Sequence, residues 1–132
     1  MRHVVVVEDD PHNAILFQKL LGRRVGCRVT MTEDPEELLA LVRSGDVALV
    51  VLDVSLKRSR WHGRPVGGVE ICRLLRNEGV HRVPVLLATA HAMRGDAERL
   101  LADSGADGYV AKPIVDHDAF VDLARNLMEK AA

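Results

Sequence analysis

Residues 4–14 read VVVVEDDPHNA: four valines, three carboxylates, and then a proline that can begin a helix. Consecutive β-branched apolar residues are typical of a strand that is buried on both faces, as in parallel sheets. Asp10 followed by Pro11 indicates a helix start, because aspartate caps the first turn and proline fits its first position. The chain is therefore predicted to begin with a buried strand that passes directly into a helix.

The carboxylates of Glu8, Asp9 and Asp10 crowd the junction between this strand and this helix. Like charges at the end of a buried strand repel one another and lose hydration. Asp10 is accounted for as the helix cap. Glu8 and Asp9 leave two interpretations open: they are solvated carboxylates, or they are ligands of a cation that screens their charge.

Apolar runs alternate with segments of helical periodicity along the rest of the chain. The predicted strands are residues 3–8, 27–32, 47–53, 83–89 and 108–112, of which the polar second one is expected at an edge. The predicted helices are residues 11–24, 34–45, 67–79, 95–105 and 116–130. Because parallel strands need crossover connections, this alternation predicts an α/β fold, a doubly wound five-stranded parallel sheet with helices on both faces.

The composition fits one ordinary globular domain that spans residues 1–132. The chain is 48% hydrophobic and 28% charged, and its net charge of −1 lacks the basic excess of a dedicated nucleic-acid binder, so no nucleic-acid partner is expected. Cys27 and Cys72 lack metal-ligand spacing and are interpreted as structural thiols in a reducing compartment. The apolar run after His3 is too short for a signal peptide or a membrane span, so a cytoplasmic location is expected.

Polar residues follow the predicted strands where each strand ends, and ligands of open parallel sheets bind at that edge. Glu8 and Asp9 follow the first strand, and Asp53 ends the third. The other residues predicted at this edge are Thr89, Ala90 and Lys112. His12 and His91, which lie near this edge in sequence, are interpreted as surface histidines.

This set of side chains has the chemistry of a phosphoryl-transfer site. Mg²⁺ prefers carboxylate oxygens and is usually held by one or two of them together with phosphate. A lysine such as Lys112 and a hydroxyl such as Thr89 would bind phosphate oxygens from the other side. Asp53 would then be the nucleophile, and Mg²⁺ would be the cofactor.

At these residues the chain resembles the response-regulator receiver domains of two-component signalling, of the chemotaxis-regulator type. VVVVEDD resembles the acidic pair of that family, with Glu8 and Asp9 in its two places, and LVVLD resembles the strand that ends in its phosphoacceptor. LLATA and GADGYVAKP match the strands that carry its switch hydroxyl, its aromatic switch residue and its lysine. The resemblance implies a flavodoxin-like sheet with strand order 2-1-3-4-5.

The resemblance also implies the role of each residue. Asp53 would accept phosphate from a histidine kinase or a phosphotransfer protein. Asp9, Asp53 and the main-chain carbonyl of Ser55 would bind Mg²⁺, and Glu8 would act through water. Thr89, Ala90 and Lys112 would bind the phosphoryl group.

The same family pattern implies a switch. Thr89 would move toward the phosphoryl group and Tyr109 would swing inward, which would reshape the face formed by the fourth helix, fifth strand and fifth helix. The peptide bond between Lys112 and Pro113 would be cis.

The segment VSLKRSRWHGRPVGGVE after Asp53 departs from the family, which usually carries a Met-Pro pair there. Lys57 replaces the proline, and extra residues precede Gly68. One interpretation is a solvated basic loop, and the other is a docking loop for a kinase, another partner or a second copy of the chain. The docking residues would be Lys57, Arg58, Arg60, Trp61 and Arg64.

The favoured function is a stand-alone response regulator with no output domain, which signals through another protein and is not a metabolic enzyme. It would catalyse only its own phosphorylation and dephosphorylation. One alternative is a small phosphohydrolase with an aspartate nucleophile, which is disfavoured because the chain offers no cap insertion. The other alternative is a receiver-like interaction module that signals without phosphate.

Overall fold

The valine run forms strand β1 (His3–Val7), which is buried along its whole length. β1 pairs in parallel with β2 on one side and with β3 on the other, as predicted. The complete order in the sheet is β2-β1-β3-β6-β7, which confirms the predicted flavodoxin-like topology. The remaining strands of this sheet are β2 (Arg28–Met31), β3 (Val47–Asp53), β6 (Val85–Thr89) and β7 (Gly108–Ala111).

This computed structural model describes residues 1–78, 82–90 and 94–131. The helices in these ranges are α1 (Pro11–Lys19), α2 (Pro35–Arg43), α3 (Gly68–Asn77), α4 (Arg94–Ser104) and α5 (His117–Ala131). His12 is exposed, as predicted, whereas His91 lies outside the described residues.

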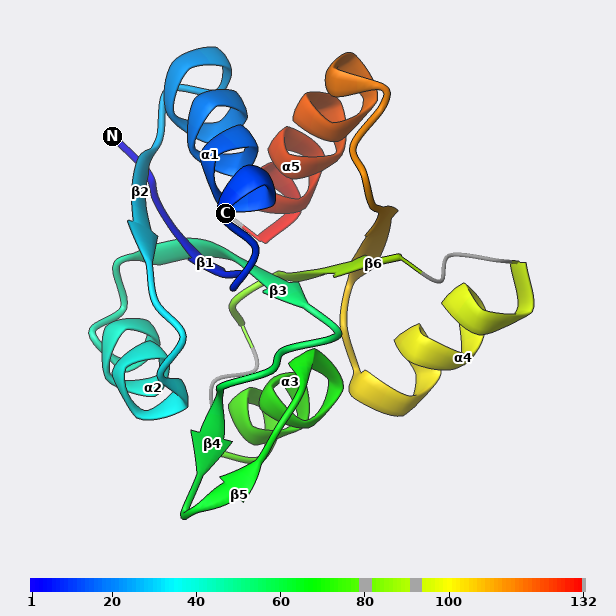
Figure 1. Ribbon diagram of the computed structural model, residues 1–132. Helices are drawn as coiled ribbons and strands as arrows, with labels where there is room; N and C mark the ends of the chain where they lie inside the picture. Colours follow the sequence, from blue (N-terminus) through cyan, green and yellow to red (C-terminus); the bar gives the residue numbers. More distant parts are fainter. Residues whose placement is uncertain (79–81, 91–93, 132) are drawn as a thin grey trace.

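The helices cover both faces of the sheet. Figure 1 shows α1 and α5 on one face and α2, α3 and α4 on the other. Strands β1, β3 and β6 contribute side chains to both cores, because successive side chains point to opposite faces of the sheet. Val4 and Val6 pack with Phe17 of α1 and Phe120 of α5, while Val5 and Val7 belong to the other core. This double burial explains why β1, β3 and β6 are apolar without alternation.

The predicted first helix is interrupted. It is an α-helix only as far as Lys19, and the segment η1 (Leu20–Arg24) continues it with the wider turn of a π-helix. The amide of Val25 donates to the carbonyl of Leu20 at 3.1 Å, which is the i to i−5 pattern of that turn. Leu20 and Leu21 are both buried, so the wider turn keeps the apolar side chains on the core.

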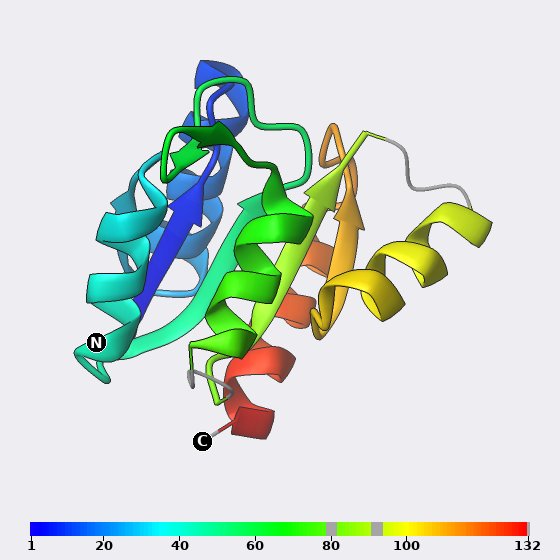
Figure 2. The same cartoon turned by 90° about the horizontal axis from the view of Figure 1, so that it is seen from below.

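The segment after Asp53 is structured, although the sequence pattern predicts a loop. It folds into a small antiparallel hairpin of β4 (Arg60–Trp61) and β5 (Arg64–Pro65). Figure 2 shows this hairpin beyond the carboxyl ends of the sheet strands. The hairpin therefore lies at the same end of the domain as the predicted site.

Both cysteines are free and buried, in agreement with their interpretation as structural thiols. In the part of the chain that the structure describes, no helix has the length and apolar character needed to cross a membrane.

Candidate functional site

The acidic residues after β1 have different environments. Asp10 is exposed and caps α1, because its Oδ1 accepts hydrogen bonds from the amides of His12 at 2.8 Å and Asn13 at 3.4 Å. The bond from His12 contributes most to a lowered pKa of Asp10. Glu8 is buried and Asp9 is partly buried. Asp10 is thus a structural cap, as predicted, and the other two acids form the site.

Asp53 at the end of β3 meets Lys112, which follows β7. The Lys112 Nζ atom lies 2.9 Å from Asp53 Oδ1 and 3.2 Å from Glu8 Oε1. The Asp53 carboxylate is also fixed by the amide of Ser55, which donates to Oδ1 at 3.1 Å. Three side chains that are distant in sequence therefore meet at one edge of the sheet, as the topology predicts.

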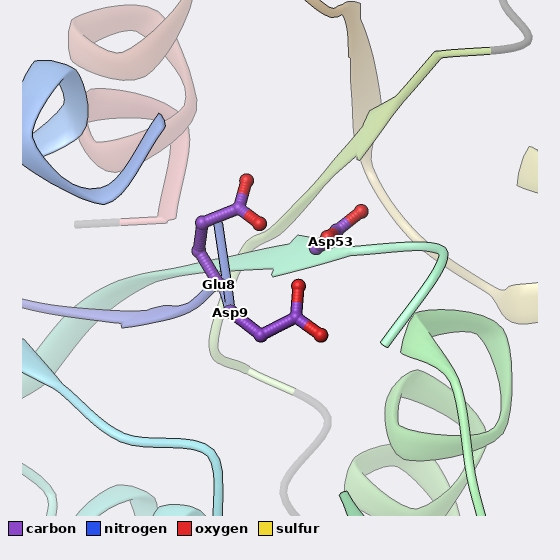
Figure 3. Close-up of side chains that lie close together, drawn as sticks. All are labelled: Glu8, Asp9 and Asp53. Atoms are coloured by element: carbon purple, nitrogen blue, oxygen red, sulfur yellow. The ribbon is translucent and has the colours of Figure 1, made fainter. Parts of the chain in front are cut away.

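Three carboxylates come together here: Glu8, Asp9 and Asp53 each offer an oxygen within 4.8 Å of the others. Figure 3 shows these carboxylates converging from β3 and from the residues that follow β1. Lys112 supplies one positive charge against three carboxylates, so the cluster keeps a negative excess even when Glu8 is protonated. Hard oxygen ligands with this excess suit a divalent cation such as Mg²⁺.

The electrostatics of the cluster follow from its burial. Burial and the neighbouring Asp53 carboxylate raise the pKa of Glu8 to about 7, although the Asp10 amide and Lys112 partly oppose the change. Burial lowers the pKa of Lys112, but Asp53 and Glu8 outweigh burial and hold that pKa above its ordinary value. Lys112 is therefore an ammonium ion at neutral pH.

The other predicted site residues lie on the neighbouring strands. Thr89 ends β6 and is only 2% exposed, and its carbonyl accepts the amide of Lys112 at 2.8 Å. Ala90 follows Thr89 and is exposed, and Tyr109 on β7 is 38% exposed. The peptide bond between Lys112 and Pro113 is cis, as predicted.

The loop after Asp53 reaches the site through its backbone, which the sequence pattern does not predict. The amide of Lys57 donates to Asp9 Oδ2 at 2.8 Å. Arg58 binds both carboxylate oxygens of Glu33 at 3.1 Å, and the Ser59 hydroxyl donates to the Glu33 carbonyl at 2.7 Å. Glu33 and Ser59 were not predicted as site residues, because their contacts depend on how the loop folds.

Comparison with known proteins agrees with this geometry. The family model described as the response regulator receiver domain matches residues 4–125. The polar-differentiation response regulator DivK of Brucella ovis is 32% identical over 114 residues, which cover 86% of this chain and 85% of that relative. DivK of Brucella anthropi has the same identity and coverage.

Solved structures show the same fold. The receiver domain of a putative Luxo repressor protein from Vibrio parahaemolyticus matches with a TM-score of 0.80 and 21% identity, over 99% of this chain and 93% of that chain. The receiver domain of a Pseudomonas aeruginosa sensor histidine kinase, solved with a magnesium ion in its active site cleft, matches with a TM-score of 0.77 and 26% identity, over 97% and 98% of the two chains. The match to the family model over nearly the whole chain shows that this protein belongs to the response regulator receiver domains of two-component signalling.

Proposed function

We propose that Asp53 is the phosphoacceptor of this receiver domain and takes its phosphoryl group from a histidine kinase or a phosphotransfer protein. The observation that carries the proposal is the position of Asp53, buried at the edge of the sheet with Lys112 2.9 Å away and two further carboxylates beside it. A buried carboxylate with this surrounding charge fits a nucleophile better than it fits a structural ion pair.

The residues present fit Mg²⁺ as the cofactor. Glu8, Asp9 and Asp53 would hold it, with the main-chain carbonyl of Ser55 as a further oxygen, and Glu8 would act through water. Bound Mg²⁺ would neutralise charge on the phosphoryl oxygens during transfer. The magnesium ion in the related Pseudomonas aeruginosa receiver domain supports this assignment.

The hydrogen bonds on Asp53 indicate which of its oxygens reacts. Lys112 and the Ser55 amide both bind Oδ1, so Oδ2 is the oxygen that we assign to the new bond. Oδ2 forms a bond to phosphorus while the bond between phosphorus and the donor's histidine nitrogen breaks, and that nitrogen leaves with the electron pair. Lys112 is already aligned to neutralise charge on the group that arrives.

We assign partner binding to the face formed by α4, β7 and α5, which phosphorylation would reshape. Thr89, Ala90 and Lys112 would bind the phosphoryl group, and Thr89 and Tyr109 would pass the change to this face. A shallow cavity of about 370 Å³ lies beside Tyr109, and its lining includes Val110, Pro113, Ile114 and Leu123. Val115 at its rim is 87% exposed, which gives a protein partner apolar surface to cover.

We further propose that the protein acts in the cytoplasm as a single receiver domain that signals through another protein. It catalyses only its own phosphorylation and dephosphorylation. A second copy of the chain is one candidate for the partner, so a homodimer is part of the proposal to be tested by its oligomeric state.

The proposal is tested by intact-protein mass spectrometry after incubation with phosphoramidate. We expect a mass gain of one phosphoryl group that needs Mg²⁺ and is lost in Asp53→Asn. Asp10→Asn is the matched control, because Asp10 caps α1 outside the cluster and its variant is expected to be labelled. A gain that persists in Asp53→Asn would overturn the assignment.

The loop and hairpin of residues 57–65, which carry Lys57, Arg58, Arg60, Trp61 and Arg64, are proposed as a docking surface for the partner that exchanges phosphate. Trp61 packs on the core and contacts His62 with ring centroids 4.5 Å apart, so the hairpin is anchored to the domain. Among the described residues, Lys57, Arg60 and Arg64 form no ion pair, whereas Arg58 is neutralised by Glu33. Aromatic and arginine side chains beside the site match the composition of interface hot spots.

Replacing Arg60 and Trp61 by alanine together is expected to lower the rate of phosphotransfer from a histidine kinase by roughly tenfold or more, since each hot-spot residue contributes over 1 kcal/mol. At saturating Mg²⁺, labelling by phosphoramidate should not change, because that donor makes no contact with the hairpin. Phosphotransfer rates for the two donors, measured side by side, check this. Equal rates from the kinase for the native and variant chains would reject the docking surface.

A further inference from the structure

The amide of Lys57 is a contact that proline could not make at this position. It donates to Asp9 Oδ2 at 2.8 Å and joins residues that are 48 positions apart. Members of the family usually carry proline here, and proline has no amide hydrogen. The exchange of proline for lysine therefore adds a hydrogen-bond donor to one of the three clustered carboxylates.

The loop holds this amide in place through contacts that lie outside the acidic cluster. Arg58 and Glu33 form two parallel hydrogen bonds of 3.1 Å, a geometry that fixes both groups. Ser59 is 2% exposed, and its hydroxyl donates to the Glu33 carbonyl at 2.7 Å. The amide of Val66 donates to the Ser59 carbonyl at 3.1 Å, which closes the hairpin behind the loop.

The turn of the hairpin provides a further sign that the loop is held in one conformation. His62 has a φ of 52° and Gly63 a φ of 80°, so a non-glycine residue adopts the left-handed conformation next to a glycine. That conformation is unfavourable for such a residue and persists where neighbouring contacts determine it. The anchored Trp61 and the bonds of Ser59 supply those contacts.

We propose that the main-chain amide of Lys57 is a positioning group for Asp9 as a metal ligand, an inference that rests on the proposed function. The amide binds Oδ2 and thereby fixes the rotation of the Asp9 carboxylate. Figure 3 shows one oxygen of this carboxylate pointing toward Asp53 while the other points away from the cluster. Because a bond to either oxygen fixes the rotation of the whole carboxylate, the amide orients it before a cation arrives.

The direction of the effect follows from this orientation. Without the amide, the partly buried Asp9 side chain would rotate among several conformers and would have to be ordered when Mg²⁺ binds. Ordering one side chain on binding corresponds to roughly a three- to tenfold loss of affinity. Each carboxylate oxygen can accept more than one partner, so the amide and a cation can use Asp9 at the same time.

Lys57→Pro and Lys57→Ala are the matched variants that test the proposal. Both lose the exposed ammonium group, but only the alanine variant keeps the amide hydrogen. We expect Mg²⁺ titration by calorimetry to give a Kd roughly three- to tenfold higher for Lys57→Pro than for Lys57→Ala. In EDTA both variants should unfold in one cooperative transition, which shows that the difference in Mg²⁺ affinity is measured on the same fold.

Phosphoramidate labelling distinguishes a loss of Asp9 positioning from a general distortion of the site around Asp53. At saturating Mg²⁺ the two variants should be labelled at equal rates, while the Mg²⁺ concentration for half-maximal rate should be higher for Lys57→Pro. If proline itself disturbs the loop, replacement of Lys57 by its α-hydroxy acid removes the same hydrogen without a ring, and it should show the same shift.

Two results would overturn the inference. Equal Kd values in all variants would mean that the amide does not position Asp9. Tighter Mg²⁺ binding by Lys57→Pro would mean that the loop competes with the cation. Failure of the native chain to bind Mg²⁺ or to be labelled would instead reject the proposed function.

Discussion

Alanine in place of Gly68 is expected to lower the free energy of unfolding by about 3 kcal/mol, the upper range for overpacking of a tight interior. A Cβ atom at Gly68 would lie 2.4 Å from the Asp53 carbonyl oxygen and 2.9 Å from its carbon. These are backbone atoms at the end of β3, so no side-chain rotation relieves the overlap. Either α3 or the strand that carries Asp53 must shift.

Because the strained atoms belong to Asp53, the same variant should also be labelled by phosphoramidate at least tenfold more slowly, since misplacement by about 1 Å can cost a hundredfold. Urea unfolding and labelling rates measure the two effects. Gly95→Ala is the control, because among the described residues no atom outside its own stretch of α4 lies within 4 Å of its Cβ, and alanine favours a helix by up to about 1 kcal/mol. A Gly68→Ala chain as stable as Gly95→Ala would contradict the described approach of α3 to β3.

The second large effect concerns Glu8 in the metal-free protein. Its side chain is fully buried, and burial with the Asp53 charge raises its pKa from 4.5 to about 7. Between these pH values the folded state binds more protons at Glu8 than the unfolded state, so stability falls as the pH rises. Glu8→Gln removes this dependence, because glutamine is uncharged and has nearly the same shape.

The difference in the free energy of unfolding between Glu8→Gln and the native chain is expected to be on the order of 3 kcal/mol at high pH. In EDTA, the stability of Glu8→Gln relative to the native chain should rise by this amount as the pH increases from about 5 to about 8. His3 has a lowered pKa and gives the opposite slope below pH 6.5, but it is present in both chains and cancels in the comparison. Urea unfolding curves at several pH values are the measurement, and parallel pH profiles would exclude an uncharged Glu8 in the native fold.

The sheet could be predicted because its signals are local and strong. β1 and β3 are buried on both faces, and a strand buried on both faces must be a continuous apolar run, which the sequence shows directly. Parallel topology then places the carboxyl ends of the strands at one edge. The sequence alone therefore assigns Glu8, Asp53 and Lys112 to one site, where the structure places them within 3.2 Å of the Lys112 ammonium.

The hairpin after Asp53 could not be predicted in the same way. Strands of two residues, such as Arg60–Trp61, are too short to show a periodic pattern. Its turn places His62 and Gly63 at positive φ, where asparagine followed by glycine is the usual signal. The contact of Lys57 with Asp9 uses a main-chain amide. Every residue except proline carries this group, so the residue type at position 57 does not reveal the contact.

Asp53 is proposed to carry the phosphoryl group. The direct measurement is borohydride reduction of the protein after phosphoramidate treatment in Mg²⁺, followed by peptide mapping, because reduction converts an aspartyl phosphate to homoserine. We expect homoserine at position 53 and none when Mg²⁺ is replaced by EDTA. Homoserine at Asp9 or Asp10, or none under conditions that label another receiver domain, would contradict it.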